Sequence, residues 1–344
     1  RPGLAVHEVP VADGGDGTVD AALAAGFRRV PVWASGPTGT PVTTVYAERA
    51  RVAVVELADV SGLARLPGGE LAPLSASSVG TGEVIRAALD AGCRTIVLGL
   101  GGSACTDGGA GMLQALGVRL TDVDGNELPP GGAALDRLNR VDITGLHPDV
   151  ADAEIVVASD VDNPLLGPHG AAAVYGPQKG ATPEQVRLLD AALSRLVDVL
   201  GAHEAARRPG AGAAGGVGFA ALAVLGAALR PGIDYLLDLV GFHRFLPDAS
   251  VVITGEGSLD AQTLHGKAPA GVAAAARAAG IPVVAVAGRC LLTRDELDGA
   301  GFAAAHALTD IEPDPGRCIA DAGPLLERLA AERLATDLAA PQEK

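Results

Sequence analysis

The chain has 344 residues, of which 48% are apolar, and its 26 Lys and Arg against 41 Asp and Glu give a formal net charge of −15. This composition excludes intrinsically disordered, collagen-like and small disulfide-stapled proteins. The acidic balance argues against nucleic-acid binding, because proteins that read the phosphate backbone need clustered Lys and Arg. The length favours two domains.

Cellular setting and membrane association are predicted from two further features. The four cysteines form no CxxC pair in a chain large enough to fold without disulfides, so reduced thiols and a cytoplasmic protein are expected. Residues 209–229 carry no charge, but their properly apolar part begins only at Val217 and suits a buried core helix better than a bilayer crossing. The first residues show no basic and apolar regions of a secretory signal.

Short β-rich apolar runs alternate with Ala- and Leu-rich helical patterns, which is typical of an α/β fold with parallel strands. The spacing predicts strands, each followed by a helix, at residues 5–11, 95–100, 154–158, 250–254 and 282–287. Residues 30–57 instead predict two or three strands in antiparallel pairing, joined by Gly and Pro turns. Thr182, followed by Pro, Glu and Gln, predicts a capped helix start. A second α+β domain at 27–148, inserted into a parallel-sheet domain of 1–26 and 149–344, would account for the change at 30–57.

Glycine, with 47 copies, occurs at about twice its usual share of roughly 7% and concentrates at strand ends. A Gly-rich turn between a strand and a helix can direct several backbone N–H groups at an anion. Ligands of open α/β sheets bind beyond the carboxyl ends of the strands, so such loops are expected to converge there. Four loops of this kind occur, ADGGDGT at 12–18, GLGGSACTDGGAGM at 99–112, SDVDNPLLGPHGAA at 159–172 and TGEGSLDAQTLHGKA at 254–268.

The second loop combines the hydroxyls of Ser103 and Thr106 with the Asp107 carboxylate and bare amides. This combination suits a phosphate or a polyol as well as a plain turn. GLGGSA also fits the G-x-G-x-x-A pattern of dinucleotide-binding proteins. A helix should then follow directly, but residues 107–109 (Asp-Gly-Gly) interrupt it, which argues against that assignment.

Carboxylates in the first and third loops are candidate metal ligands. Asp160 and Asp162 lie close together at the end of a predicted strand, and Mg²⁺ takes one or two such carboxylates beside water and substrate phosphate. The same spacing also fits an Asx turn before Pro164. Asp13 and Asp16 could hold a metal or cap the helix that follows.

The fourth loop brings Glu256, Ser258, Asp260 and Lys267 together before another helix. A lone Lys in a loop is usually solvated, but Gly266 beside it would permit close approach to a phosphate. The segment is not a standard P-loop, because the Ser or Thr after the Lys and the upstream Gly are missing. No HExxH spacing supports a zinc site.

Taken together, VPVADGGDGTVDA, GLGGSACTDGGAGM, ASDVDNPLLGPHGAAAVYGPQKGA and VVITGEGSLDAQTLHGKAP resemble, in family order, the motifs of the bacterial glycerate kinase family. The resemblance implies a flavodoxin-like domain with an inserted, restriction-enzyme-like α+β domain. It also implies phosphorylation of D-glycerate by ATP with Mg²⁺, with 2-phosphoglycerate favoured as the product. Members normally begin with a further strand and an APDSFKGSLSA-like loop, which this chain, beginning at Arg1, does not show.

Phosphoryl transfer needs alignment, charge neutralisation and a carboxylate that orients the attacking hydroxyl. On this basis the Asp107 carboxylate is the expected base, with Asp260 as its rival, and Lys267 is expected to neutralise the transferred group. The expected nucleotide contacts are Gly101, Gly102, Ser103, Thr106, Gly215, Gly216, Glu256 and Ser258. The expected Mg²⁺ ligands are Asp160 and Asp162. The expected substrate contacts are Asp13, Asp16, Lys179 and Arg289.

Two other functions stay open at this point. One is an NAD-dependent hydroxy-acid oxidoreductase, and the other is a non-catalytic ligand-binding remnant. The expected partners are glycerate and ATP, with neither nucleic acid nor membrane. The oligomeric state is open, with a homodimer as one option.

Overall fold

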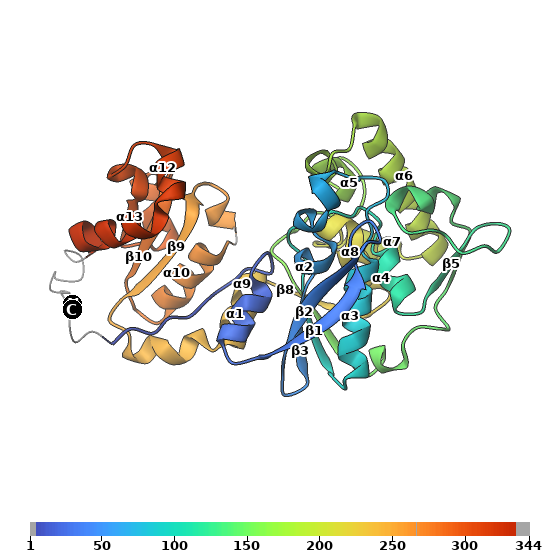
Figure 1. Ribbon diagram of the computed structural model, residues 1–344, viewed down its shortest axis with the longest axis horizontal. Helices are drawn as coiled ribbons and strands as arrows, with labels where there is room; N and C mark the ends of the chain where they lie inside the picture. The colour runs from blue at the N-terminus through green and yellow to red at the C-terminus, as the bar shows by residue number, and fades with distance from the viewer. Residues whose placement is uncertain (1–4, 266, 335–344) are drawn as a thin grey trace. The chain divides into compact units, whose positions relative to one another are not determined.

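A computed structural model describes residues 5–265 and 267–334 of the chain. The chain divides into two compact units (Figure 1). The larger unit is Glu8–Val240, and the smaller unit comprises the described residues of Arg1–His7 and Gly241–Lys344. Each unit contains its own sheet flanked by helices.

The larger unit is built on a six-stranded sheet in the order β1-β2-β3-β4-β7-β8. Its strands are β1 Arg28–Ser35, β2 Pro41–Arg49, β3 Val52–Glu56, β4 Thr95–Gly99, β7 Glu154–Ala158 and β8 Ala228–Arg230, and a separate two-stranded sheet pairs β5 Arg119–Thr121 with β6 Arg140–Asp142. Its helices are α1 Thr18–Ala24, α2 Ala58–Ser61, α3 Val79–Asp90, α4 Ala110–Ala115, α5 Ala171–Tyr175, α6 Pro183–Leu200, α7 His203–Arg207, α8 Ala213–Ala223 and α9 Gly232–Val240.

The six-stranded sheet changes direction between its two halves. β1, β2 and β3 pair antiparallel, as predicted for residues 30–57, whereas β3, β4, β7 and β8 pair in parallel. Strands β3, β4 and β7 are short and mostly apolar, and residues on both of their faces are buried, as is usual for parallel strands covered by helices on each side. Helices α1 and α9 contact β3 and β7 respectively, and α3 packs against β1, β2 and β3. The carboxyl ends of the parallel strands therefore lie along one edge of the sheet.

Two helices of the larger unit confirm predictions from local sequence. Helix α6 begins after Thr182, whose side chain accepts from the Gln185 N–H while the Gln185 side chain accepts from the Thr182 N–H. Helix α8 is apolar on all sides and its residues are buried, as expected for a core helix. No helix within residues 5–265 and 267–334 is long and apolar enough to cross a membrane.

The smaller unit has a parallel sheet in the order β11-β10-β9. Its elements are β9 Val252–Leu259, α10 Ala268–Ala278, β10 Val283–Cys290, α11 Arg294–Ala300, β11 Ala304–Ala307, α12 Pro315–Ala320 and α13 Ala322–Leu329. Strand β9 runs further than predicted, so Glu256 and Ser258 lie on a strand rather than in a loop. The alternating burial along β9 shows why the apolar run at 250–254 underestimated its length.

The structure also differs from the sequence-based expectations in one predicted strand and in the predicted domain boundaries. Residues 5–11 form no strand within the described chain, because they are mostly exposed and make no ladder, and Pro10 carries no backbone donor. The predicted boundaries at 27 and 149 fall inside the larger unit, where β4 and β7 pair from Thr95↔Glu154 to Gly99↔Ala158. Segments on both sides of the predicted boundary therefore share one sheet. The α/β class is confirmed, whereas the flavodoxin-like and restriction-enzyme-like descriptions stay predictions.

Candidate active site

Two of the glycine-rich loops meet at the carboxyl ends of β4 and β7. Gly14 has a φ of +94°, and a Cβ added to it would lie 2.2 Å from the Ala158 carbonyl oxygen. A Cβ added to Gly101 would lie 2.4 Å from the Cα atom of Gly15, and the Gly101 N–H donates to the Gly14 carbonyl at 3.1 Å. Only residues without a side chain allow this approach, so the glycines bring the first two loops together.

The third loop joins the same edge through Asp160. Its carboxylate accepts from the Gly232 N–H at 3.0 Å, at the start of α9. A Cβ on Gly232 would lie 2.0 Å from the Asp13 carbonyl oxygen, so this helix start also touches the first loop. The surrounding chain displaces solvent and raises the pKa of Asp160 to about 6, with the charges of Asp13 and Asp234 adding to the shift and the amides at the helix start opposing it.

Asp160 is the centre of the candidate Mg²⁺ site, with Asp13 and Asp234 as the nearby carboxylates. Within residues 5–265 and 267–334, no group of three or more His, Cys, Asp or Glu side chains is arranged to hold a metal ion. Mg²⁺ needs only one or two carboxylates when phosphate and water complete its shell. A divalent cation would also offset the repulsion that Asp13 and Asp234 exert on Asp160. The residues present therefore fit a magnesium ion held jointly with a phosphate. Asp162, the second predicted ligand, is exposed on the same loop.

Asp107, the expected base, is buried in the body of the second loop with 0% exposure. Its two oxygens accept from the Ser77 hydroxyl, from both the amide and the hydroxyl of Ser78, and from the Gly109 and Gly111 amides, at 2.8 to 3.2 Å. A carboxylate with five donor groups and no solvent access has no free position for a substrate proton. This geometry suits a structural role and does not suit the base predicted from the sequence.

The segment 212–218, expected to contact phosphate, is also buried. Ala214, Gly215 and Gly216 have φ values of 52°, 65° and 96°, so three successive residues adopt the left-handed conformation before the regular part of α8. A Cβ on Gly215 would lie 2.1 Å from the Cys105 carbonyl oxygen, and the Gly108 N–H donates to the Gly215 carbonyl at 3.0 Å. These glycines pack against residues 105–108 of the second loop, and their amides are buried away from solvent.

Lys179, expected to bind substrate, is 1% exposed and belongs to the same buried body. Its ammonium donates to the Ser103 hydroxyl at 2.8 Å and to the Cys105 carbonyl. Burial lowers the pKa of Lys179, and the nearby Asp107 charge opposes that shift. Thr106 is likewise buried, and its hydroxyl has no hydrogen-bond partner within the described part of the chain. The Lys179 ammonium therefore binds groups of the second loop and does not reach into solvent.

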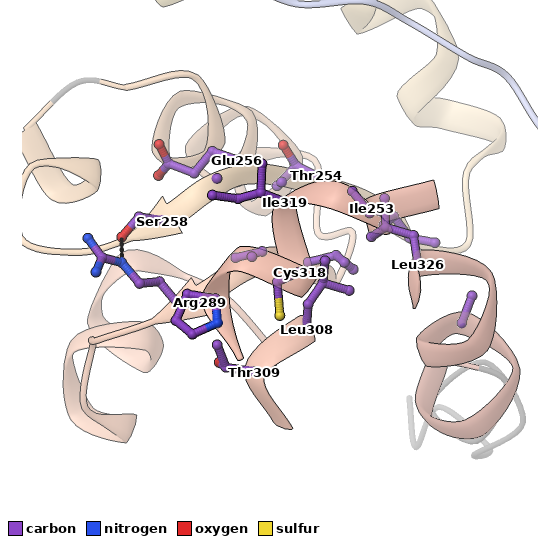
Figure 2. A pocket seen from close by; sticks show the side chains of 18 of the residues that line it. Ile253, Thr254, Glu256, Ser258, Arg289, Leu308, Thr309, Cys318, Ile319 and Leu326 are labelled. Atoms are coloured by element: carbon purple, nitrogen blue, oxygen red, sulfur yellow. Dashed lines mark hydrogen bonds between the residues drawn. The ribbon is translucent and has the colours of Figure 1, made fainter. Parts of the chain in front are cut away.

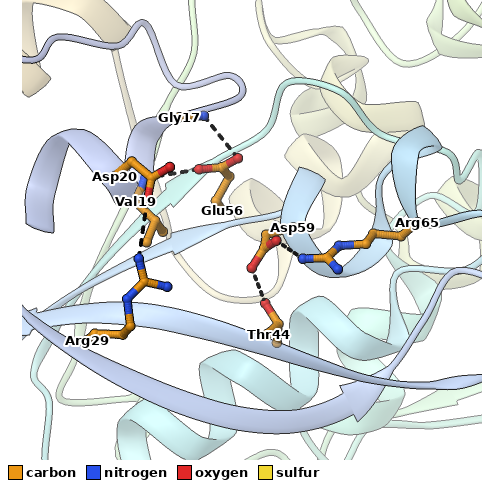
Figure 3. Close-up of polar contacts among 8 residues, drawn as sticks. All are labelled: Gly17, Val19, Asp20, Arg29, Thr44, Glu56, Asp59 and Arg65. Atoms are coloured by element: carbon orange, nitrogen blue, oxygen red, sulfur yellow. Dashed lines mark hydrogen bonds and ion pairs between the residues drawn. The ribbon is translucent and has the colours of Figure 1, made fainter.

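A polar cluster that the sequence analysis missed lies at the end of β3 (Figure 3). Glu56 accepts from the Gly17 and Val19 amides at 3.1 and 3.0 Å and so caps α1. Asp59 accepts from the Thr44 hydroxyl and pairs with Arg65. Burial raises the pKa of Glu56, and the charges of Asp16 and Asp59 raise it further. The structure pairs β3 in parallel with β4, which places the end of β3 beside the loop after β4, whereas the sequence predicts only antiparallel pairing over residues 30–57.

Five predicted residues come together in the smaller unit, at the carboxyl ends of β9 and β10. The Lys267 ammonium lies 3.6 Å from the Glu256 carboxylate, and Arg289 donates to the Ser258 hydroxyl at 3.0 Å. Ser258 in turn donates to Asp260 at 3.2 Å. The Gln262 N–H donates to the Asp260 carboxylate at 2.9 Å. This hydrogen bond, that of Ser258 and the charge of Lys267 lower the pKa of Asp260.

Three of these five residues, Glu256, Ser258 and Arg289, line a cavity of about 990 Å³ (Figure 2). Glu256, Ser258 and Arg289 form a polar end, while Ile253, Leu308, Ile319 and Leu326 are among its apolar walls from β9 and the chain after β11. Apolar walls with a few convergent polar groups are typical of small-molecule sites. Gly266, predicted to let a phosphate approach Lys267, lies outside the described residues.

Comparisons with known proteins agree on one family. The profile of the Glycerate kinase family matches residues 1–338. A Bacillus subtilis (strain 168) protein named glycerate kinase is 47% identical over 295 residues, which is 83% of this chain and 77% of the relative. An Escherichia coli (strain K12) protein named glycerate 2-kinase is 46% identical over 287 residues, 81% of this chain and 75% of the relative. A crystal structure from Salmonella typhimurium LT2, described provisionally as glycerate kinase 2, is 45% identical with a TM-score of 0.79, covering 89% of this chain and 82% of that one.

Proposed function

Because the chain belongs to the glycerate kinase family, we propose that it transfers the γ-phosphoryl group of ATP to a hydroxyl of D-glycerate. The match over residues 1–338, together with glycine-rich loops that meet at the ends of parallel strands, is the observation that carries the proposal. The 2-hydroxyl is the proposed acceptor, since one similar protein is named glycerate 2-kinase. The product is then 2-phosphoglycerate.

In the larger unit, the exposed tip of the second loop and the acidic end of β7 carry the proposed contacts. Gly102 and Asp16 are exposed, so the Gly102 amide can reach a phosphate, whereas the Gly101 amide donates to the Gly14 carbonyl. Asp160 is the proposed Mg²⁺ ligand, with Asp162 as the secondary one. Bound Mg²⁺ would neutralise charge on the transferred group.

In the smaller unit, Lys267 and Arg289 are the proposed cations for phosphate and carboxylate oxygens. Asp260 replaces Asp107 as the proposed partner of the glycerate hydroxyl, because Asp260 is accessible and Asp107 is saturated by hydrogen bonds. The low pKa of Asp260 keeps it ionised, which suits a carboxylate that orients a nucleophile in phosphoryl transfer.

The experiment that tests this function is ADP release with D-glycerate, ATP and Mg²⁺. Asp260→Asn is expected to lower kcat roughly 100-fold, and Asp248→Asn, an exposed carboxylate of the same unit, should stay within about twofold. Chelating Mg²⁺ with EDTA should abolish the release. Wild-type protein that releases no ADP in response to glycerate would refute the function, whereas an Asp260→Asn variant with normal kcat would refute only the role of Asp260.

A further inference from the structure

The Lys179 ammonium is buried in the larger unit, and in the part of the chain that the structure describes its hydrogen bonds go to neutral groups, although the Asp107 charge lies near enough to act on it. It lies at the end of the turn Pro177–Lys179, is 1% exposed, and forms no ion pair with a carboxylate within residues 5–265 and 267–334. Its hydrogen bonds go to the Ser103 hydroxyl and to the Cys105 carbonyl. Burying an ammonium with neutral partners is costly, so the position of this charge calls for an explanation.

The direction of the hydrogen bond from Lys179 to Ser103 determines whether the Ser103 hydroxyl can donate to a further group. An ammonium has donors and no acceptor, so the Ser103 oxygen must accept. The Ser103 proton is therefore available to another acceptor, and the hydroxyl donates to none within the described part of the chain. Lys179 thus converts a rotatable hydroxyl, which could accept or donate, into a donor.

Ser103 lies at the border between the buried and the exposed part of the second loop. It is 7% exposed, the preceding Gly102 is exposed, and the following residues 104–111 are buried. An isolated bridge to Gly62 fixes its backbone. Ser103 therefore lies where the loop passes from its exposed to its buried part, and its oxygen is bound to Lys179.

The acceptor that best matches this donor is an anionic oxygen. A positive charge behind a hydroxyl polarises its O–H bond, and hydrogen bonds with an ionised partner are about twice as strong as neutral ones. In the proposed reaction the anionic oxygens belong to the carboxylate of glycerate or to a phosphate of ATP. Separate KM values for the two substrates distinguish these sources.

We infer that Lys179 is a positioning residue, which holds the Ser103 hydroxyl so that its proton is donated to an anionic oxygen of the bound substrate. The inference rests on the proposed function and adds a role that differs from direct substrate contact by Lys179. The competing explanation is that Lys179 only offsets the buried charge of Asp107, which acts on its pKa.

The first test replaces Ser103 and leaves Lys179 in place. Ser103→Ala is expected to raise the KM of one substrate roughly 10- to 100-fold with an unchanged melting temperature, and Ser103→Thr, which retains the hydroxyl, should restore most of the affinity. Ser194→Ala, on α6 outside the loops, is the matched control and should change neither constant. A folded Ser103→Ala variant with both KM values and kcat within about twofold of wild type overturns the inference.

The second test asks whether Lys179 acts through Ser103. The loss of kcat/KM in Lys179→Met should be largely absent when Ser103 is already Ala, whereas losses that multiply in the double variant overturn the inference. If Lys179→Met does not fold, Lys179→Arg takes its place in the same cycle. If wild-type protein shows no turnover, the proposed function fails, and calorimetry with D-glycerate and with ADP decides the inference separately. Weaker binding to Ser103→Ala then supports it, and equal or absent binding overturns it.

Discussion

Asp107 and Asp160 are both carboxylates at the ends of parallel strands, yet their surroundings give them different roles. Asp107 is enclosed by donors from two segments of the chain, which occupy both of its oxygens. Asp160 has like charges nearby and a pKa raised to about 6, so a cation would favour its ionised form. The residue types alone did not separate these two cases.

The structural role of Asp107 predicts a large loss of stability without its charge. Asp107→Asn replaces one charged acceptor by an amide whose N–H₂ group faces donors, so the free energy of unfolding should fall by about 3 kcal/mol. Asp124→Asn, the same change at an exposed position, should cost less than about 0.5 kcal/mol. Urea unfolding measures both variants. Equal, small effects would show that the buried hydrogen bonds of Asp107 contribute little.

Glu56 predicts a pH dependence of stability whose sign is fixed. Burial raises its pKa in the folded protein, so the folded state holds more protons than the unfolded state at pH values above the ordinary Glu pKa of about 4.3. Its contribution is present at low pH and is lost as the pH rises through the raised pKa. Glu56→Gln cannot titrate, so wild type should lose stability relative to this variant between about pH 4 and pH 7.5. Urea unfolding at both pH values would contradict this if the difference stayed constant or grew in favour of wild type.

At the scale of single elements, the start of helix α6 is determined by its local sequence, the capping box of Thr182 and Gln185. Thr182→Ala removes one side of the capping box and should cost about 1 kcal/mol, which lowers the melting temperature by a few degrees. Thr38→Ala, at an exposed turn residue, is the control and should leave it nearly unchanged. Calorimetric scans compare the two, and equal melting temperatures would mean that the cap contributes nothing measurable.

The contact between the first two loops depends on Gly101. Gly101→Ala places a methyl group 2.4 Å from Gly15 Cα, so the loops must separate, and both stability, by roughly 1–3 kcal/mol, and ADP release should fall. Gly299→Ala is the matched control, because its Cβ meets nothing within 4 Å and neither glycine has a positive φ. Thermal unfolding and activity are measured on both. A Gly101→Ala variant as stable and active as wild type would show that this contact is dispensable.

Strands β4 and β7, helix α6 and the antiparallel pairing of β1 to β3 could be predicted because each is encoded by a local apolar pattern or cap. The burial of Asp107 and Lys179 could not, because it depends on segments such as 77–78 and 212–218 that are distant in sequence. The prediction of a strand at residues 5–11 is wrong, because a β-rich composition does not supply a strand for it to pair with. The site role of Glu56 could not be predicted, because the sequence of residues 30–57 indicates antiparallel strand pairing and not the parallel pairing of β3 with β4.

At the scale of the whole molecule, the chain places proposed site residues in both compact units. The larger unit holds Ser103 and Asp160, and the smaller unit holds Asp260, Lys267 and Arg289. Each set lies at the carboxyl ends of parallel strands, which is where α/β sheets bind ligands.

The identity of the product tests the central claim most directly. Phosphorus NMR of the protein with ATP, Mg²⁺ and D-glycerate should show a phosphate monoester resonance that coincides with added 2-phosphoglycerate and grows as ATP is consumed. A resonance of 3-phosphoglycerate alone would refute the proposed acceptor hydroxyl. Consumption of ATP without any phosphoglycerate, or no consumption by folded protein, would contradict the proposal that these glycine-rich loops serve phosphoryl transfer to glycerate.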